Sequence, residues 1–353
     1  MHEPCRDFSS DNITPAAPEL MAALTEANQG TAHSYGDDPW TRRLEARAQA
    51  VFGCQLAIYP VATGTASNAL ALAAMSPPHG GVFCHEDAHI DNDECAAPGF
   101  FTGGAQLLGL PGAHGKLEPA AISPVLARMR ERGVHQVRPA AISLSQATEW
   151  GTVYTPGEIA AITGFAHAQG MTVHMDGARL ANAIAALGCT PAEATVGAGV
   201  DVLSLGATKN GALAAEAVIF FNLELAAEFE YRRKRAAQLF SKMRYASAQL
   251  AAFLEDGLWL RLATQANAMA ARLAAGLAQI PGISLAAPVQ ANELFVVLPE
   301  PVLAALQAEG FGFYRWNAPA GVTGSVIRLV TAWCTQAEDV DILLEACHRH
   351  TRG

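Results

Sequence analysis

The sequence is poor in charged and aromatic residues, and it contains no long apolar run. Only 16% of its 353 residues are charged and 7% are aromatic, whereas 51% are hydrophobic. Such a chain can bury a large core, which excludes an intrinsically disordered protein. No apolar stretch is long enough to span a bilayer, so we expect no transmembrane helix.

Basic residues are also scarce. Lys and Arg number 23 against 33 Asp and Glu, so the formal net charge is −10. Non-specific binding to nucleic acid or to an anionic membrane depends on clustered Lys and Arg. The charge balance therefore argues against both partners and favours a small-molecule substrate.

The seven cysteines include no Cys-x-x-Cys pair, and an odd number cannot all form disulfides within one chain. We interpret them as reduced thiols. The N-terminal segment has neither a basic leader nor an apolar secretory core. Both features predict a cytoplasmic protein.

Strand-like and helix-like segments alternate over most of the chain. We expect strands at residues 56–61, 81–84, 106–110, 140–144, 172–175, 202–205 and 216–221, and helices at 18–27, 41–52, 65–75, 119–132, 156–169 and 223–235. This alternation predicts an α/β fold with a mostly parallel sheet that is covered by helices on both faces.

The C-terminal part of the chain has a different order of expected helices and strands. A long helix is expected at residues 246–279, followed by strands at 294–298 and 326–330 and helices at 301–309 and 336–349. We place a domain boundary inside the long helix. It separates a large domain, residues 1–253, from a small α+β domain, residues 254–353.

Two apolar strands end in residues with distinctive chemistry. Asp176 closes the run that begins at Met171, and Lys209 follows the run that begins at Val202. The carboxyl ends of parallel strands are where binding sites form in such sheets. A lysine that can form a Schiff base and a carboxylate that keeps a pyridine nitrogen protonated are what pyridoxal phosphate requires. Each motif alone is equally compatible with an interior strand followed by a surface residue.

Two further segments suit the same cofactor. Gly64 and Thr65 stand where a strand turns into an alanine-rich helix, whose N-terminal N–H groups can hold a phosphate. His89 is a candidate for stacking on the pyridine ring. The simpler interpretations are an ordinary helix cap and a loop histidine. A metal site is a further alternative, with the candidate ligands His85, His89, Asp91 and Cys95.

Taken together, the motifs resemble those of the low-specificity threonine aldolases, which are fold-type-I lyases that depend on pyridoxal 5′-phosphate. The resemblance covers about residues 7 to 335. It rests on Asp7-Phe-Ser-Ser10-Asp, Tyr35-Gly-Asp-Asp, Gly64-Thr65, Ala88-His89-Ile, His174-Met-Asp176-Gly-Ala-Arg179, Thr208-Lys209-Asn-Gly, Met243-Arg244 and Ile327-Arg328-Leu-Val.

The resemblance implies a role for each matching residue. Lys209 would bind the cofactor aldehyde, Asp176 would pair with the pyridinium, and His89 would stack on the ring. Gly64 and Thr65 would hold the phosphate, and Thr208 would also bind the cofactor. The substrate side would include Ser10, His33, Arg179 and Arg328, with the two guanidinium groups suited to gripping a carboxylate.

Arg179 would also contact the cofactor. Arg244 would reach the cofactor pocket of a neighbouring subunit, which implies a homo-oligomer built as a dimer of dimers. Alternation along the strand at 326–330 places Arg328 on one face, which favours an internal position over solvent.

One position departs from the family pattern. Many members have a Thr-His pair where this chain has Thr148-Glu149. Glutamate is a weak base near neutral pH unless burial raises its pKa. The group that accepts the substrate's hydroxyl proton therefore stays open among His89, a water positioned by Glu149, and His33.

The implied reaction is retro-aldol cleavage of L-β-hydroxy-α-amino acids such as threonine, allo-threonine and phenylserine to glycine and an aldehyde. A β-eliminating lyase or an aminotransferase on the same scaffold is the nearest alternative. More distant alternatives are a metal-dependent hydrolase or metal-binding protein and a non-catalytic binding protein.

Overall fold

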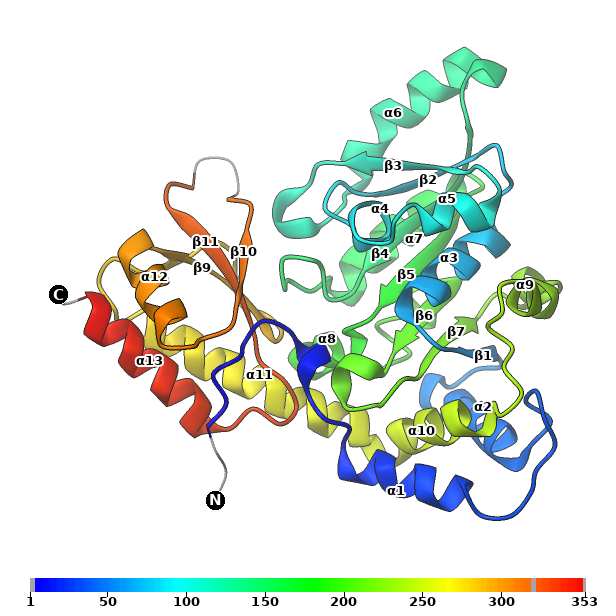
Figure 1. Ribbon diagram of the computed structural model, residues 1–353. Coiled ribbons are helices and arrows are strands. Elements are labelled where there is room, and N and C mark those ends of the chain that lie inside the picture. Colours follow the sequence, from blue (N-terminus) through cyan, green and yellow to red (C-terminus); the bar gives the residue numbers. More distant parts are fainter. Residues whose placement is uncertain (1–3, 319–321, 352–353) are drawn as a thin grey trace.

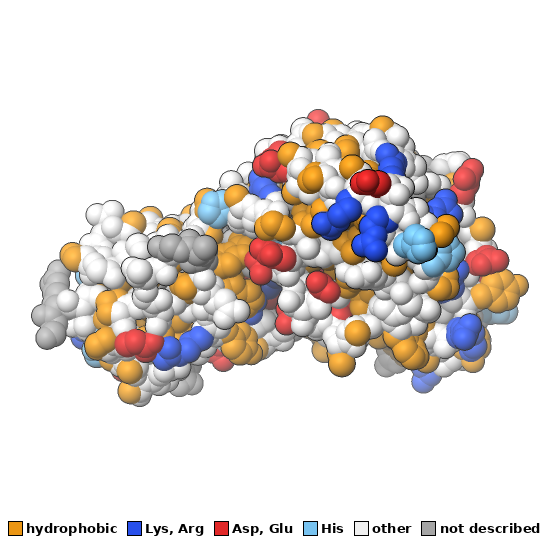
Figure 2. All heavy atoms as spheres, turned by 90° about the horizontal axis from the view of Figure 1, so that it is seen from above, with side chains coloured by type: hydrophobic (Ala, Val, Ile, Leu, Met, Phe, Trp, Pro, Cys, Tyr) orange, Lys and Arg blue, Asp and Glu red, His pale blue; other side chains and the backbone are white. Residues whose placement is uncertain are grey.

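The computed structural model describes residues 4–318 and 322–351, which form two lobes of unequal size (Figure 1). Within these residues, the strands make a seven-stranded sheet in the larger lobe and a four-stranded sheet in the smaller lobe. Figure 2 shows the two lobes side by side from above.

The larger sheet has the strand order β1-β7-β6-β5-β4-β2-β3. From β6 to β3 each strand runs parallel to its neighbours, whereas β7 is antiparallel to both β1 and β6. The mostly parallel sheet expected from the alternating pattern is therefore confirmed. Its strands are β1 (Ala57–Val61), β2 (Gly80–His85), β3 (Gln106–Leu110), β4 (Arg138–Ser145), β5 (Thr172–Gly177), β6 (Val202–Gly206) and β7 (Glu216–Phe220).

Helices cover both faces of this sheet, and each face buries its own hydrophobic cluster. Helices α3 and α9 pack on one face, and α2, α6, α7, α8 and α10 contribute to the core on the other. The helices up to this point are α1 (Pro18–Ala27), α2 (Pro39–Phe52), α3 (Gly64–Met75), α4 (His89–Asn92), α5 (Ala97–Thr102), α6 (Pro119–Arg132), α7 (Pro156–Ala168), α8 (Leu180–Leu187), α9 (Phe229–Arg235) and α10 (Arg244–Leu254).

The smaller sheet is antiparallel, with the order β10-β11-β9-β8. Alternate residues of β9 and β11, such as Leu294 and Ile327, pack against helices α11 to α13. Phe295 and Val326 belong to a different cluster on the opposite face. The elements are α11 (Leu258–Leu277), β8 (Ser284–Leu285), β9 (Glu293–Leu298), α12 (Glu300–Ala308), β10 (Tyr314–Trp316), β11 (Ser325–Val330) and α13 (Ala337–Thr351).

The expectation of one long helix over residues 246–279 is wrong. The helix is interrupted by a 3₁₀ turn, Glu255–Gly257, which separates α10 from α11. Asp256 has φ 47° and Gly257 has φ 69°, and a right-handed helix cannot continue through this left-handed conformation. Apolar residues lie on both sides of the break, so hydrophobic periodicity alone did not reveal it.

The helix expected at residues 223–235 is also interrupted. A 3₁₀ segment, Leu223–Ala226, precedes α9. The short elements α4, α5, β8 and β10 had no clear pattern in the sequence. The division at residue 253 stays a prediction, and α10 ends at the neighbouring Leu254. Within the described residues, no helix has the length and apolarity that crossing a membrane requires.

The first prediction concerns the break between α10 and α11. Phe253 is fully buried, and its ring lies 5.9 Å from that of Trp259, so the pair joins the two helices. Replacing Phe253 by Ala leaves a cavity, and we expect a loss of about 3–5 kcal/mol in the free energy of unfolding. Urea unfolding followed by circular dichroism measures the loss.

The matched control is Phe100→Ala, because Phe100 is 78% exposed. It should change the unfolding free energy by no more than about 0.5 kcal/mol. Equal effects of the two substitutions would contradict the role assigned to Phe253.

Candidate active site

A cavity of about 640 Å³ lies where the carboxyl ends of the central strands meet the smaller sheet. Asp176 is in β5 and Lys209 follows β6, and these two strands are parallel neighbours. Most of the residues singled out in the sequence line this cavity: Ser10, Gly64, Thr65, His89, Glu149, Asp176, Arg179, Thr208, Lys209 and Arg328.

Lys209 stands on a short 3₁₀ turn, Thr208–Asn210, and is half-buried. Among the residues that the structure describes, its amine makes no hydrogen bond or ion pair. Its charge nevertheless lies close enough to influence the pKa values of Asp11, His89 and Glu216. The amine is therefore surrounded by ionisable groups and still free to react.

Asp176 is held from two sides. Its Oδ2 accepts a hydrogen bond from Asn68 Nδ2 at 2.8 Å, and its Oδ1 accepts one from the Ala178 N–H at 3.0 Å. His174 lies two residues earlier in β5 and bonds to the hydroxyls of Ser143 and Ser204. Burial lowers the pKa of His174 to about 4, so this imidazole is neutral at neutral pH.

The N-terminus of α3 opens onto the cavity. Thr63 caps the helix, because its Oγ1 accepts a hydrogen bond from the Ala66 N–H at 3.1 Å. Gly64 and Thr65 are the first two residues of the helix, so their N–H groups have no carbonyl one turn earlier in the helix to bond to. A Cβ at Gly64 would meet nothing within 4 Å. These N–H groups are thus available to an anion.

His89 begins α4, and Glu94 fixes its ring. The distance between His89 Nδ1 and Glu94 Oε1 is 3.0 Å, and this hydrogen bond raises the pKa of His89 although burial opposes it. Asn68 also donates to Glu94 Oε1, at 2.8 Å. Asn68 therefore links the carboxylates of Glu94 and Asp176, and neither Asn68 nor Glu94 carried a signal in the sequence.

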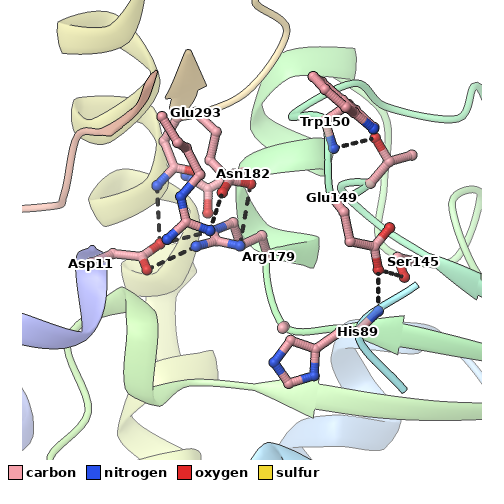
Figure 3. A network of polar contacts seen from close by, with 12 residues as sticks. Asp11, His89, Ser145, Glu149, Trp150, Arg179, Asn182 and Glu293 are labelled. Atoms are coloured by element: carbon pink, nitrogen blue, oxygen red, sulfur yellow. Dashed lines mark hydrogen bonds and ion pairs between the residues drawn. The ribbon is translucent and has the colours of Figure 1, made fainter. Parts of the chain in front are cut away.

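Glu149 lies in the loop after β4 and points into the cavity. Its Oε1 accepts hydrogen bonds from Ser145 Oγ at 2.5 Å and from the His89 N–H at 2.9 Å (Figure 3). Its buried Oε2 has no partner among the described residues. Burial raises the pKa of Glu149 above its ordinary value, although the hydrogen bond from Ser145 opposes this shift.

Arg179 lies between two buried carboxylates (Figure 3). Its Nε and Nη2 each donate to Asp11 at 2.9 Å, and its Nη1 is 3.2 Å from Glu293 Oε2. Burial would raise the pKa of Asp11, but the charges of Arg179 and Lys209 lower it overall. Neither Asp11 nor Glu293 was predicted as a site residue. Asp11 adjoins Ser10 in the motif Asp7-Phe-Ser-Ser10-Asp, whereas no motif includes Glu293.

Arg328 is placed differently. Its guanidinium lies over the rings of Tyr314 and Trp316, with centroid distances of 5.5 and 5.0 Å. Nη2 donates to the Ser9 carbonyl, and Nη1 is 3.7 Å from Glu293. Its buried Nε has no hydrogen-bond partner among the described residues. The side chain therefore keeps one donor free beside the cavity.

Glu216 is another acid that the sequence analysis missed. It opens β7, is 7% exposed and lines the cavity. The Thr208 N–H donates to its Oε1 at 3.3 Å. Burial raises its pKa to about 7.

Two of the predicted residues do not line the cavity of this chain. His33 is exposed and lies 3.4 Å from Asp37. Arg244 donates to the Gly30 carbonyl and lies over the ring of Trp40. The structure thus brings neither side chain to the Lys209 amine of the same chain.

The metal ligands considered from the sequence do not form one group. Among the described residues, the ligand atoms of His89, Glu94 and Asp176 lie within 4.8 Å of one another, and His85, Asp91 and Cys95 do not join them. His85 instead bonds to Gly112 and Asp87 through its two ring nitrogens.

The arrangement of residues agrees with the similarity of this chain to known proteins. Residues 7–300 match the family model described as "Beta-eliminating lyase". A low specificity L-threonine aldolase from Pseudomonas aeruginosa is 44% identical over 340 residues, which cover 96% of each chain. The protein of the same name from Pseudomonas sp. (strain NCIMB 10558) is 43% identical over 336 residues and 95% of each chain.

Solved structures show the same fold. A Leishmania major threonine aldolase superposes with a TM-score of 0.92 at 27% identity, covering 98% of this chain and 100% of that one. An aspartate aminotransferase from Rhodobacter sphaeroides, 18% identical, has a TM-score of 0.71 over 100% of this chain and 93% of its own, and shares the fold alone. The predicted fold-type-I architecture is thereby confirmed.

The family match covers most of the chain, and the two Pseudomonas relatives align over nearly its full length. The chain therefore belongs to the beta-eliminating lyase family, among the low-specificity L-threonine aldolases.

Proposed function

We propose that this protein cleaves the Cα–Cβ bond of L-β-hydroxy-α-amino acids, including threonine, allo-threonine and phenylserine, and releases glycine and an aldehyde. The observation that carries the proposal is that Lys209 and Asp176, at the ends of neighbouring parallel strands, line one cavity. The names of the Pseudomonas relatives support the reaction type. The protein is accordingly a carbon–carbon lyase.

The residues of the cavity fit pyridoxal 5′-phosphate. Lys209 has an amine without a partner among the described residues, and it would hold the cofactor through its aldehyde. Gly64 and Thr65 offer free N–H groups beside open space for the phosphate, with Thr208 nearby. Asp176, fixed by Asn68, would pair with the pyridine nitrogen. When bound, the cofactor supplies an electron sink for the charge left on Cα.

We assign the substrate carboxylate to Arg328, with Ser10 beside it in the cavity. The free Nε of Arg328 and its support by Tyr314 and Trp316 favour this role. Arg179 was expected to share it, but all three of its nitrogens already face the carboxylates of Asp11 and Glu293. Arg179 then acts mainly as a positioning residue that keeps these acids paired.

We assign the hydroxyl proton to Glu149, which takes it directly or through a water. Its Oε2 is buried and unpartnered in the described structure, and its raised pKa makes it a stronger base than an exposed glutamate. Ser145 and the backbone of His89 hold its other oxygen in place. His89, oriented by Glu94, would stack on the cofactor ring, whereas His33 lies outside the cavity of its own chain.

The remaining proposals concern assembly and location. We propose a dimer of dimers in which Arg244 reaches a neighbouring cofactor site, since Arg244 is only half-buried in the single chain. We also propose a domain boundary after residue 253. The seven cysteines form no disulfide, which supports a reducing compartment such as the cytoplasm.

The second prediction tests the reaction and its nucleophile. Purified protein with added pyridoxal 5′-phosphate should form glycine from threonine, allo-threonine and phenylserine. Lys209→Ala should lose both glycine formation and the visible absorbance of the covalently bound cofactor, because the amine is gone. Product analysis and an absorbance scan measure the two effects.

Lys242→Ala is the control, because Lys242 is exposed and outside the cavity. It should keep the absorbance. Ammonia with a keto acid in place of glycine would identify an eliminating lyase or an aminotransferase. Full turnover by Lys209→Ala would refute the assigned nucleophile.

The third prediction concerns the base. Glu149→Gln should lower kcat by about 10²-fold or more while leaving cofactor binding intact. Because the base must be ionised and burial raises its pKa, activity of the natural protein should decline with falling pH earlier than an exposed glutamate would allow. A pH–rate profile shows this limb.

Ser145→Ala provides the matched test. The hydrogen bond from Ser145 lowers the pKa of Glu149, so its removal should move the acid limb to higher pH. An unchanged limb in both variants would argue that another group accepts the proton.

The fourth prediction separates the two arginines. Arg328→Ala should reduce kcat/KM for threonine by roughly tenfold to a hundredfold, because a charge-assisted bond to the substrate is worth about 1.5–3 kcal/mol. Arg179→Ala should instead lower the unfolding free energy by about 3–5 kcal/mol, because it leaves buried Asp11 and Glu293 without their partner. Kinetics and urea unfolding of both variants would reveal a reversed assignment.

A further inference from the structure

Glu216 is a buried acid of the cavity that the proposed reaction leaves without a role. In the sheet, it lies opposite Val61 of β1 on one side and Gly206 of β6 on the other. Val61 leads into Thr63, the cap of α3, and Gly206 leads into Lys209. Glu216 is therefore placed between the N-terminus of α3 and the reactive amine.

Few charges act on this carboxyl group. Besides its burial, the influences on it are the hydrogen bonds with Thr208 and the charges of Lys209 and Asp176. Helix α3, which packs on β7, has no ionisable residue between Gly64 and Met75. In β1 the ionisable residue is Tyr59, which is influenced by Glu230, Arg233 and Glu45 and is not among the groups that influence Glu216. Lys209 is thus the one cation among the described influences on Glu216.

The electrostatic consequence follows from the charge of a phosphate ester, which is close to −2 above neutral pH. An ionised Glu216 beside the α3 N-terminus would repel such a group, because both are negatively charged and Glu216 is buried away from solvent screening. A protonated Glu216 would not, and its hydroxyl could donate a hydrogen bond. Since burial raises the pKa of Glu216 to about 7, both forms are populated near neutral pH.

We propose that Glu216 is a proton-linked cofactor-binding residue, which takes up a proton when the phosphate of the cofactor occupies the N-terminus of α3. The inference rests on the proposed function, because it presumes a phosphate-bearing cofactor in this cavity. Affinity for that cofactor then falls as the pH rises above neutrality, by up to about tenfold per pH unit, since the protein must first recover a proton.

Binding of 4′-deoxypyridoxine 5′-phosphate tests the proposal, because this analogue lacks the aldehyde and cannot react with Lys209. Its Kd is measured between pH 6 and pH 9 with the full-length protein freed of cofactor. Glu216→Gln keeps an acceptor for the Thr208 N–H and cannot ionise. We expect the variant to match the natural protein at pH 6 within about twofold and to bind up to about a hundredfold tighter at pH 9.

Two controls locate the effect. Glu149→Gln removes another buried acid, but β5 and β6 lie between β4, which precedes Glu149, and β7. It should retain the pH slope of the natural protein. 4′-Deoxypyridoxine, which lacks the phosphate, should bind with the same pH dependence in the natural protein and in Glu216→Gln.

A calorimetric measurement covers the case in which Glu216→Gln fails to fold. Titration of the natural protein at pH 8 in buffers of different ionisation enthalpy counts the protons taken up, and we expect uptake with the phosphorylated analogue only. The role of Glu216 would be overturned if the Kd of the natural protein and that of Glu216→Gln changed with pH in parallel, or if no protons were taken up on binding. If the protein neither binds pyridoxal 5′-phosphate nor makes glycine, the proposed function itself fails.

Discussion

The ion pairs of Arg179 join three parts of the chain around one cavity. Asp11 comes from the N-terminal segment, Arg179 follows β5 of the larger sheet, and Glu293 begins β9 of the smaller sheet. Each of these side chains is costly to bury alone, and their mutual pairing offsets that cost. The cavity can therefore form between the lobes only when the three segments are assembled together.

The other polar side chains of the site fall into two kinds, those that have hydrogen-bond partners and those that have none. Asp176 is held by Asn68 and Ala178, and His89 is oriented by Glu94. Such groups have a fixed position and provide the framework. The Lys209 amine and the free oxygen of Glu149 lack partners in the described structure, so they remain able to bond to a ligand. Buried polar groups are usually satisfied, which makes the unpartnered oxygen of Glu149 informative.

Much of the fold was predictable from local pattern. Apolar runs and helix-forming segments gave the strands of the larger sheet and most helices, with ends displaced by a few residues. The break at Asp256 and Gly257 was not visible in the hydrophobic pattern, because apolar residues lie on both sides of it, although the Asp-Gly dipeptide itself is typical of a turn. Short elements such as α4 and β10 were missed because they depend on contacts with distant residues.

The sequence by itself determined the order of strands and helices along the chain, and it placed Asp176 and Lys209 at the ends of two apolar strands. That these two strands are parallel neighbours was decided by the assembled sheet. The sequence also determined the residue types that identify the family. Only the tertiary structure decided which charges are paired. Glu293 and Glu216 face the cavity because of how β9 and β7 are set against distant strands, and Arg179 is paired because Asp11, from the N-terminal segment, lies against it in the fold. Burial and pairing are properties of the assembled fold, and these two properties shift the pKa of an acid and leave an amine free.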